Sequence, residues 1–221
     1  MKKLFPLFLL SSSLMLTACG LVGGLVGNRS MYEEPSYTTL DTLGNNITVR
    51  QYGTRLVAEA SATDKNLDEA GDDAFRLLFD YISGANGAGD KVSMTVPVEM
   101  GPKDSSEKIS MTTPVDSLTS GSTVTMLFFF PQEYTLETAP VPNNSRITVR
   151  EQAGETLAVL RLSGTMNEAR KQEESEELLR ALGETNWVPT GPARALYYDP
   201  PFTIPPLRRN EVIIPVEQRT P

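Results

Sequence analysis

Most of the chain alternates between short apolar runs and polar residues, and only two segments carry apolar residues at the spacing of an amphipathic helix. The first follows Asn66, and Glu69 lies three residues later, as in a helix-capping box. Its apolar positions share one face and end before Gly84: Leu67, Ala70, Ala74, Phe75, Leu78, Phe79 and Ile82. The second covers residues 167–182, which are highly charged at first and apolar at the end. Both segments are expected to be surface helices with one buried face.

Short runs rich in β-branched and aromatic residues surround these helices and are expected to be strands. In the first half of the chain they are residues 47–52, 56–62, 91–99, 108–115 and 123–130. Residues 91–99 and 108–115 contain related Met-Thr-x-Pro-Val strings and are expected to pair as a hairpin. In the second half the expected strands are residues 147–151, 156–163, 193–198 and 212–216. The Pro-containing residues 133–144 connect the two halves.

The two halves repeat one another at a spacing of 100 residues. The string Ile-Thr-Val-Arg at residues 47–50 recurs at residues 147–150. At the same offset Leu78 matches Leu178, and the order of strands and helix is the same in both halves. The repeat predicts a single α+β domain over residues 34–221. We expect a curved antiparallel sheet, or distorted β-barrel, of two pseudo-symmetric halves with two flanking helices.

The N-terminus carries the features of an export signal. A short basic start is followed by an apolar stretch, residues 4–16, which is too short to span about 30 Å of hydrocarbon comfortably. The stretch ends in Leu-Thr-Ala-Cys-Gly, which resembles the lipobox of bacterial lipoproteins. The resemblance implies cleavage after residue 18, acylation of Cys19, and a Gly-rich lipidated tether over residues 19–33. The expected partner is therefore a lipid bilayer of the cell envelope. Gly20 resembles the sorting pattern of outer-membrane lipoproteins, which face the periplasm where the source has two membranes.

Composition narrows the chemistry further. The chain has 20 Lys and Arg against 28 Asp and Glu, a formal charge of −8, which disfavours binding to nucleic acid. It contains no histidine, which excludes an imidazole base and any His-ligated metal or haem. Its one cysteine is the lipidation candidate, so no disulfide or free thiol is expected. No metal-binding or nucleotide-binding motif is found, and a binding protein is expected rather than an enzyme.

Five strings in order resemble the SOUL haem-binding protein family, over most of the mature chain. They are Ile-Thr-Val-Arg-Gln-Tyr at residues 47–52, Tyr-Ile-x-Gly-x-Asn at 81–86, Met-Thr-x-Pro-Val at 94–98, Tyr-Asp-Pro at 198–200 and Arg-Arg-Asn-Glu-Val at 208–212. The resemblance implies a distorted antiparallel barrel of duplicated halves, related to gyrase-inhibitor-like effector-binding domains. It also implies binding of haem or another tetrapyrrole, in a hydrophobic cleft or through an axial histidine. Without histidine, the chain could hold a tetrapyrrole only by apolar burial, by ion pairing with its propionates, or through a weaker axial group.

Seven residues are the candidates for such a cleft: Phe75, Arg76, Phe79, Met94, Tyr197, Arg208 and Arg209. The phenylalanines would form an apolar wall, and the arginines would meet propionates or another anionic group. Met94 and Tyr197 are candidate weak axial groups, and the sequence offers Met111, Tyr52, Tyr81 and Tyr198 as alternatives.

Each candidate also has a structural interpretation. The phenylalanines belong to a helix face that packs on the sheet, and Arg76 has Asp72, Asp73 and Asp80 within pairing distance along a helix. Arg208 and Arg209 are suited to satisfy carbonyls and carboxylates where the last strand closes the sheet.

Two other functions remain open at this point. One is an envelope scaffold or interaction lipoprotein, for which the sequence names no protein partner. The other is an effector-binding module, in which a carboxylate such as Glu59 or Glu99 faces a cationic small molecule.

Overall fold

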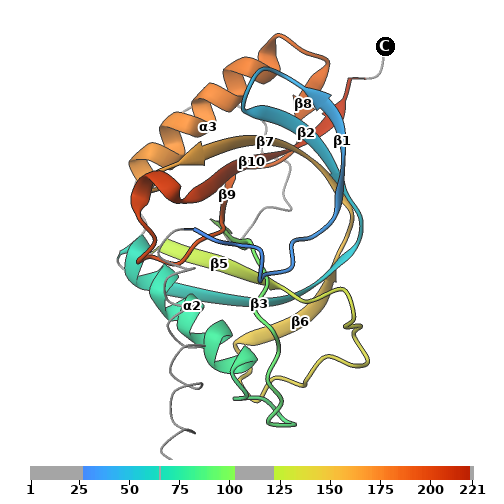
Figure 1. Ribbon diagram of the computed structural model, residues 1–221, viewed down its shortest axis with the longest axis vertical. Helices are drawn as coiled ribbons and strands as arrows, with labels where there is room; N and C mark the ends of the chain where they lie inside the picture. Colours follow the sequence, from blue (N-terminus) through green and yellow to red (C-terminus); the bar gives the residue numbers. More distant parts are fainter. Residues whose placement is uncertain (1–26, 65, 103–121, 220–221) are drawn as a thin grey trace, which may run out of the picture.

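The computed structural model describes residues 27–64, 66–102 and 122–219, which form one curled antiparallel sheet with two helices on its outer side (Figure 1). The elements are β1 Tyr37–Thr42, β2 Ile47–Tyr52, β3 Arg55–Asp64, α2 Leu67–Ile82, β4 Val98–Pro102, β5 Ser122–Phe129, β6 Ile147–Gln152, β7 Glu155–Ser163, α3 Glu168–Gly183, β8 Trp187–Pro189, β9 Arg194–Tyr197, a 3₁₀ turn Pro205–Leu207 and β10 Arg209–Gln218. The strand order is β1-β2-β7-β10-β9-β4-β5-β3-β6, and β8 pairs with β10 beside this path. The expected α+β half-barrel with two flanking helices is confirmed.

The strand order is a palindrome of the two halves. Apart from β1, β2-β7-β10-β9 mirrors β6-β3-β5-β4 about a pseudo-two-fold axis between β9 and β4. The halves exchange their first strands, because β2 pairs with β7 and β6 pairs with β3. Even the register repeats: Ile47 lies opposite Leu160, and Ile147 lies opposite Ala60. The 100-residue repeat is therefore built into the backbone pairing.

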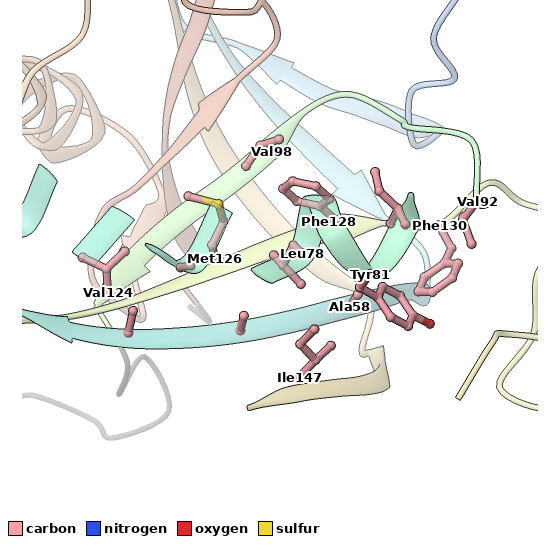
Figure 2. Packing of buried hydrophobic residues seen from close by; sticks show 14 of the residues in the cluster. Ala58, Leu78, Tyr81, Val92, Val98, Val124, Met126, Phe128, Phe130 and Ile147 are labelled. Atoms are coloured by element: carbon pink, nitrogen blue, oxygen red, sulfur yellow. The ribbon is translucent and has the colours of Figure 1, made fainter. Parts of the chain in front are cut away.

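Alternation along the strands gives the sheet two different faces. On the outer face Ala58 and Ala60 of β3 and Phe128 of β5 pack under α2 together with Leu78 and other residues (Figure 2). On the concave face the neighbouring residues Val57, Leu127 and Phe129 form a separate small cluster. The concave face is the inside of the curl and also carries most of the buried charges described below.

The two helices begin as their sequences predict. Asn66 caps α2 by accepting a hydrogen bond from the N–H of Asp68, and Asn167 caps α3 by accepting one from the N–H of Arg170. Their packing differs in extent, since α2 buries six residues and α3 buries two: Ala70, Gly71, Ala74, Leu78, Tyr81 and Ile82 in α2, and Leu178 and Leu182 in α3. None of the helices in the described ranges is long and apolar enough to cross a bilayer.

The expected strand over residues 91–99 is wrong for most of its length, because β4 begins at Val98. Pro97 has no N–H to donate to a ladder, and the N–H of Val96 donates instead to the carbonyl of Glu33. The other arm of the expected hairpin, residues 108–115, lies outside the described residues. The edge strand β1 was missed because its residues are almost all exposed and polar, with no apolar alternation.

Contacts of the folded domain also begin earlier than residue 34. Arg29 pairs with Asp199 at 2.6 Å, and the Oε1 of Glu33 accepts a hydrogen bond from the N–H of Gln132. Part of the segment that the sequence predicted to be a tether is therefore held against the domain.

Candidate functional site

The outward side of α2 exposes two aromatic rings that stack on each other. Phe75 and Phe79 are one helical turn apart, and their ring centroids lie 5.9 Å apart with an interplanar angle of 15°. Their exposed fractions are 38% and 45%, high for phenylalanine. Phe75 also contacts the buried ring of Phe128 edge to face, with centroids 5.5 Å apart. The pair is thus an extension of the core onto the surface, and we call it the aromatic pair.

Of the other predicted residues, Arg76 adjoins the aromatic pair, and Met94 packs against the core cluster that includes Phe128. Arg76 is exposed on α2, three residues before Phe79 and on the adjoining side of the helix. One of its expected acidic partners, Asp73, pairs instead with Arg146 at 2.7 Å. Met94 is half-buried and lines a small pocket together with Phe128, the ring that Phe75 contacts. An apolar surface with a neighbouring cation suits a flat, partly exposed ring system that carries an acidic group.

The same positions in the second half are different. At the offset of 100 residues, Ser175, Glu176 and Leu179 of α3 replace the two phenylalanines and the arginine. Ser175 donates a hydrogen bond to the carbonyl of Lys171, and Glu176 accepts one from Gln172. The aromatic pair and its arginine therefore belong to α2 and have no counterpart on α3.

The other three predicted residues lie elsewhere. Tyr197 of β9 is half-buried, and burial, with Glu168 and Asp68 near it, raises its pKa to about 12. Arg208 donates hydrogen bonds to the carbonyls of Thr203 and Pro201 in the loop before β10.

Arg209 points into the concave face instead. It pairs with Glu34 at 3.0 Å and Glu211 at 2.9 Å, and its guanidinium lies 3.7 Å from the centre of the Tyr198 ring. Glu211 also binds Arg50 at 3.0 Å and accepts a hydrogen bond from Tyr198. Burial, with Glu211 beside it, raises the pKa of Tyr198 well above its usual value. These groups form a closed network, so the structure does not bring Arg209 together with the aromatic pair.

A second charge network on the concave face joins the two halves across the axis. Arg194 binds Glu99 and Glu155, each at 2.6 Å, and Glu155 also binds Arg55 at 2.6 Å. Burial raises the pKa of Glu99, although Arg194 opposes the shift. Burial alone would also raise the pKa of Glu155, but Arg194 and Arg55 together lower it. The network was missed from the sequence, and its one visible signal was that Arg55 and Glu155 are opposite charges 100 residues apart.

The two carboxylates that the sequence proposed for a cationic ligand both have arginine partners. Glu59 pairs with Arg150 at 2.6 Å, and Glu99 pairs with Arg194. Both line a pocket of about 60 Å³ on the concave face. Because the two charges are already compensated, this pocket offers little net attraction for a cation.

A pocket at the rim of the concave face has a volume of about 290 Å³, near the lower limit for pockets that hold small ligands, about 300 Å³. Phe129 and Tyr134 line it, together with Arg55, Glu33 and Glu34. The guanidinium of Arg55 lies over the Phe129 ring and is already paired with Glu155. No cluster of possible metal ligands occurs in the described part of the chain.

Two solved structures share this fold. The C-terminal domain of EcmrR aligns with a TM-score of 0.56 at 10% identity, over 82% of this chain and 98% of that one. An uncharacterized conserved protein from Listeria innocua aligns with a TM-score of 0.51 at 13% identity, over 78% of this chain and 92% of that one. At such low identity these similarities show the fold alone.

Sequence comparison gives the family. Heme-binding protein 1 of Sus scrofa is 28% identical over 155 residues, which are 70% of this chain and 76% of that protein. The Bos taurus protein of the same name is 27% identical over 157 residues, 70% of this chain and 75% of that protein. Residues 32–215 match the family described as SOUL heme-binding protein. The chain belongs to the SOUL heme-binding protein family.

Proposed function

We propose that the chain binds haem or another tetrapyrrole on the outer side of α2, without histidine ligation. The observation that carries the proposal is the exposed aromatic pair with Arg76 beside it, in a member of a family described as heme-binding. Heme-binding protein 1 of Sus scrofa and of Bos taurus supports the same ligand class.

The residues on α2 fit a tetrapyrrole better than the pocket at the rim of the concave face does. Phe75 and Phe79 offer a flat apolar surface to a macrocycle, and Arg76 offers a cation to a propionate. The rim pocket places Glu33 where an anionic ligand would be repelled, and its arginine is already paired with Glu155. Bound iron would supply redox or axial-ligand chemistry, while the chain's own residues would supply apolar burial and charge pairing.

A haem titration tests this site. The mature chain with Cys19→Ser, produced without residues 1–18, is titrated with haem and followed at the Soret band. We expect saturable binding that Phe75→Ala and Phe79→Ala each weaken about tenfold, the effect of losing about 1.4 kcal/mol of apolar contact. The matched control is Leu179→Ala, which truncates the equivalent exposed position of α3 and should leave the affinity unchanged. Saturable binding that neither phenylalanine affects would place the ligand elsewhere.

A second titration tests the absence of an essential iron ligand. Iron-free protoporphyrin has the same macrocycle and propionates as haem. If apolar contact and charge pairing hold the ligand, its affinity should lie within a few-fold of that of haem, and Met94→Leu should change neither. A large preference for the iron-containing ring, removed by Met94→Leu, would instead show ligation by the thioether.

We also propose that acylation of Cys19 anchors the chain in the cell envelope, in the outer membrane facing the periplasm where there are two membranes. The lipobox string at residues 16–20 supports this. Cells fed an alkyne analogue of palmitate should label the wild-type chain and not Cys19→Ser. Equal labelling of the two chains, or no labelling of the wild-type chain, would refute the anchor.

A further inference from the structure

The loop between β9 and β10 carries a run of exposed apolar residues. Residues 200–207 read Pro-Pro-Phe-Thr-Ile-Pro-Pro-Leu and contain no charge. The exposed fractions are 56% for Phe202, 43% for Ile204 and 46% for Leu207, and the prolines 201, 205 and 206 are exposed as well. Large exposed apolar side chains gathered in one short loop mark an interaction surface.

The loop is fixed in this conformation by its own polar contacts. Thr203 is 1% exposed, so the chain turns it inward between the outward-facing Phe202 and Ile204. Arg208 donates a hydrogen bond to the Thr203 carbonyl, and the N–H of Leu207 donates to the carbonyl of Ile204. The apolar side chains are therefore held outward by the structure.

The N-terminal segment meets the same loop. Gly27 has φ +69° and lies so close to the loop that a Cβ on it would come within 2.8 Å of the Leu207 carbonyl oxygen. Two residues later Arg29 pairs with Asp199, the residue just before the loop. Met31 and Tyr32 follow and are 81% and 38% exposed. Two further exposed apolar side chains thus follow the residues that hold the N-terminal segment against the loop.

The length of chain before Gly27 then sets how far this surface can be from a membrane. Cys19 precedes Gly27 by eight residues, which reach at most about 29 Å when fully extended. An acyl chain on Cys19 would lie in the bilayer, so the loop would stand within about 30 Å of the lipid headgroups at all times.

We propose that the loop of residues 200–207, with Met31 and Tyr32, docks on the bilayer that holds Cys19. The proposal rests on the anchor at Cys19 proposed above. The occupant is the lipid interface rather than a protein, because the surface is apolar and uncharged and the chain enters it from the lipidated end. The net charge of −8 gives no attraction to anionic lipid, so docking should depend on apolar insertion and should vary little with ionic strength.

Depth measurement on the anchored chain tests the docking. Trp187, the only tryptophan, is changed to Phe, and Phe202→Trp or Val141→Trp supplies a single reporter. Val141 is the matched control, since it is 72% exposed and lies between β5 and β6, where its carbonyl accepts a hydrogen bond from Gly87. On phosphatidylcholine vesicles with brominated acyl chains, we expect at least twofold quenching at position 202 and little at 141. Ile204→Ser with Leu207→Ser should halve the quenching at 202.

The same vesicles separate failure of docking from failure of the anchor. The chain that begins at residue 19 is coupled through its only cysteine to a maleimide lipid, so it is anchored whether or not cells acylate it. Equal, low quenching at 202 and 141 on this coupled chain would overturn the docking surface and leave the acylation proposal standing. Protection of the reporter at position 202 from acrylamide, without quenching by brominated lipid, would show that a second copy covers the loop, and would also overturn it.

Discussion

The two helices are the clearest comparison within the molecule. Two buried apolar positions are kept between them, because Leu78 corresponds to Leu178 and Ile82 to Leu182 where both helices pack over equivalent strands. The exposed positions have diverged, with the aromatic pair on α2 and a charged surface on α3. Packing restrains what lies beneath a helix and leaves its outer side free to change. A duplicated fold can therefore carry a ligand surface on one half only.

The concave face shows a different kind of divergence. Arg55 and Glu155 occupy equivalent positions in the repeat and pair with each other across the axis. Glu99 lies opposite Leu127 of β5, and Arg194 lies opposite Ile213 of β10. Because β5 and β10 are equivalent strands of the two halves, Glu99 and Arg194 occupy equivalent positions as well, and they also pair. Identical charges at such positions would repel one another. Opposite charges at equivalent positions instead join the two halves.

The largest effect on stability is expected when one partner of the ion pair between Glu99 and Arg194 is removed. Arg194→Leu leaves the buried Glu99 without its cation, which costs about 3–5 kcal/mol of stability. Urea unfolding of the mature chain measures the loss. Because burial raises the pKa of Glu99 above its unfolded value, the folded state holds the proton more strongly. The stability that protonated Glu99 contributes is present below the unfolded pKa and is lost as the pH rises. The free energy of unfolding of the variant should therefore be reduced less at pH 5 than at pH 8.

A matched double variant provides the control for this prediction. Glu99→Leu together with Arg194→Leu removes both charges, while Glu155 keeps Arg55 as its partner. Most of the stability should return, because two apolar side chains replace a buried ion pair. An equal loss in the single and double variants would mean that shape, and not the uncompensated charge, matters at this position.

Making α2 resemble α3 should give the next largest effect. Phe75→Ser, Arg76→Glu and Phe79→Leu combined should weaken haem binding at least 100-fold, or about 2.7 kcal/mol, because apolar contact and charge pairing are both lost. Phe75→Ser also removes the ring contact with Phe128, so the unfolding midpoint should fall, and the affinity is measured under conditions where the variant is fully folded. Isothermal titration measures the affinity and urea unfolding the stability. An unchanged affinity for haem would show that the aromatic pair does not contribute to binding the ligand.

Making α3 resemble α2 is a gentler test of the same comparison. Ser175→Phe, Glu176→Arg and Leu179→Phe place the three side chains at equivalent positions, without the support that Phe128 gives to Phe75. A second, weaker equivalent of haem should then bind, about tenfold below the first, since the ring contact beneath is missing. The binding stoichiometry reports it. A single equivalent would show that the three side chains on a helix are insufficient without a ring such as Phe128 beneath them.

Much of the fold follows from the sequence because the repeat and the apolar spacing of each helix are local signals. The Ile-Thr-Val-Arg strings even correspond to the exchanged strands β2 and β6. The concave networks were predictable only in part. Arg208 and Arg209 bind carbonyls and carboxylates beside the last strand, as the sequence suggests, but the arginine partner of Glu99 comes from a distant strand and depends on the curl of the sheet. The aromatic pair was singled out by its spacing. Its exposure depended on how far α2 extends beyond Phe128, which only the packing shows.

The smallest effect concerns the stability of the first half of the chain at alkaline pH. Tyr81 lies on the buried face of α2 and donates a hydrogen bond to the Pro140 carbonyl, whereas the equivalent position of α3 is Ala181. Burial, with Tyr134 near it, raises the pKa of Tyr81 from 10.0 to about 12. The folded state therefore holds the phenolic proton more strongly. The stability that this provides is complete below pH 10 and is lost between pH 10 and 12.

Tyr81→Phe should cost about 1 kcal/mol of stability at pH 8, through the lost hydrogen bond, and should flatten the decline in stability above pH 10. Urea unfolding from pH 8 to 12 checks this, with Tyr32→Phe, an exposed tyrosine, as the control. Parallel declines of wild type and Tyr81→Phe would show that other tyrosines set the alkaline limit.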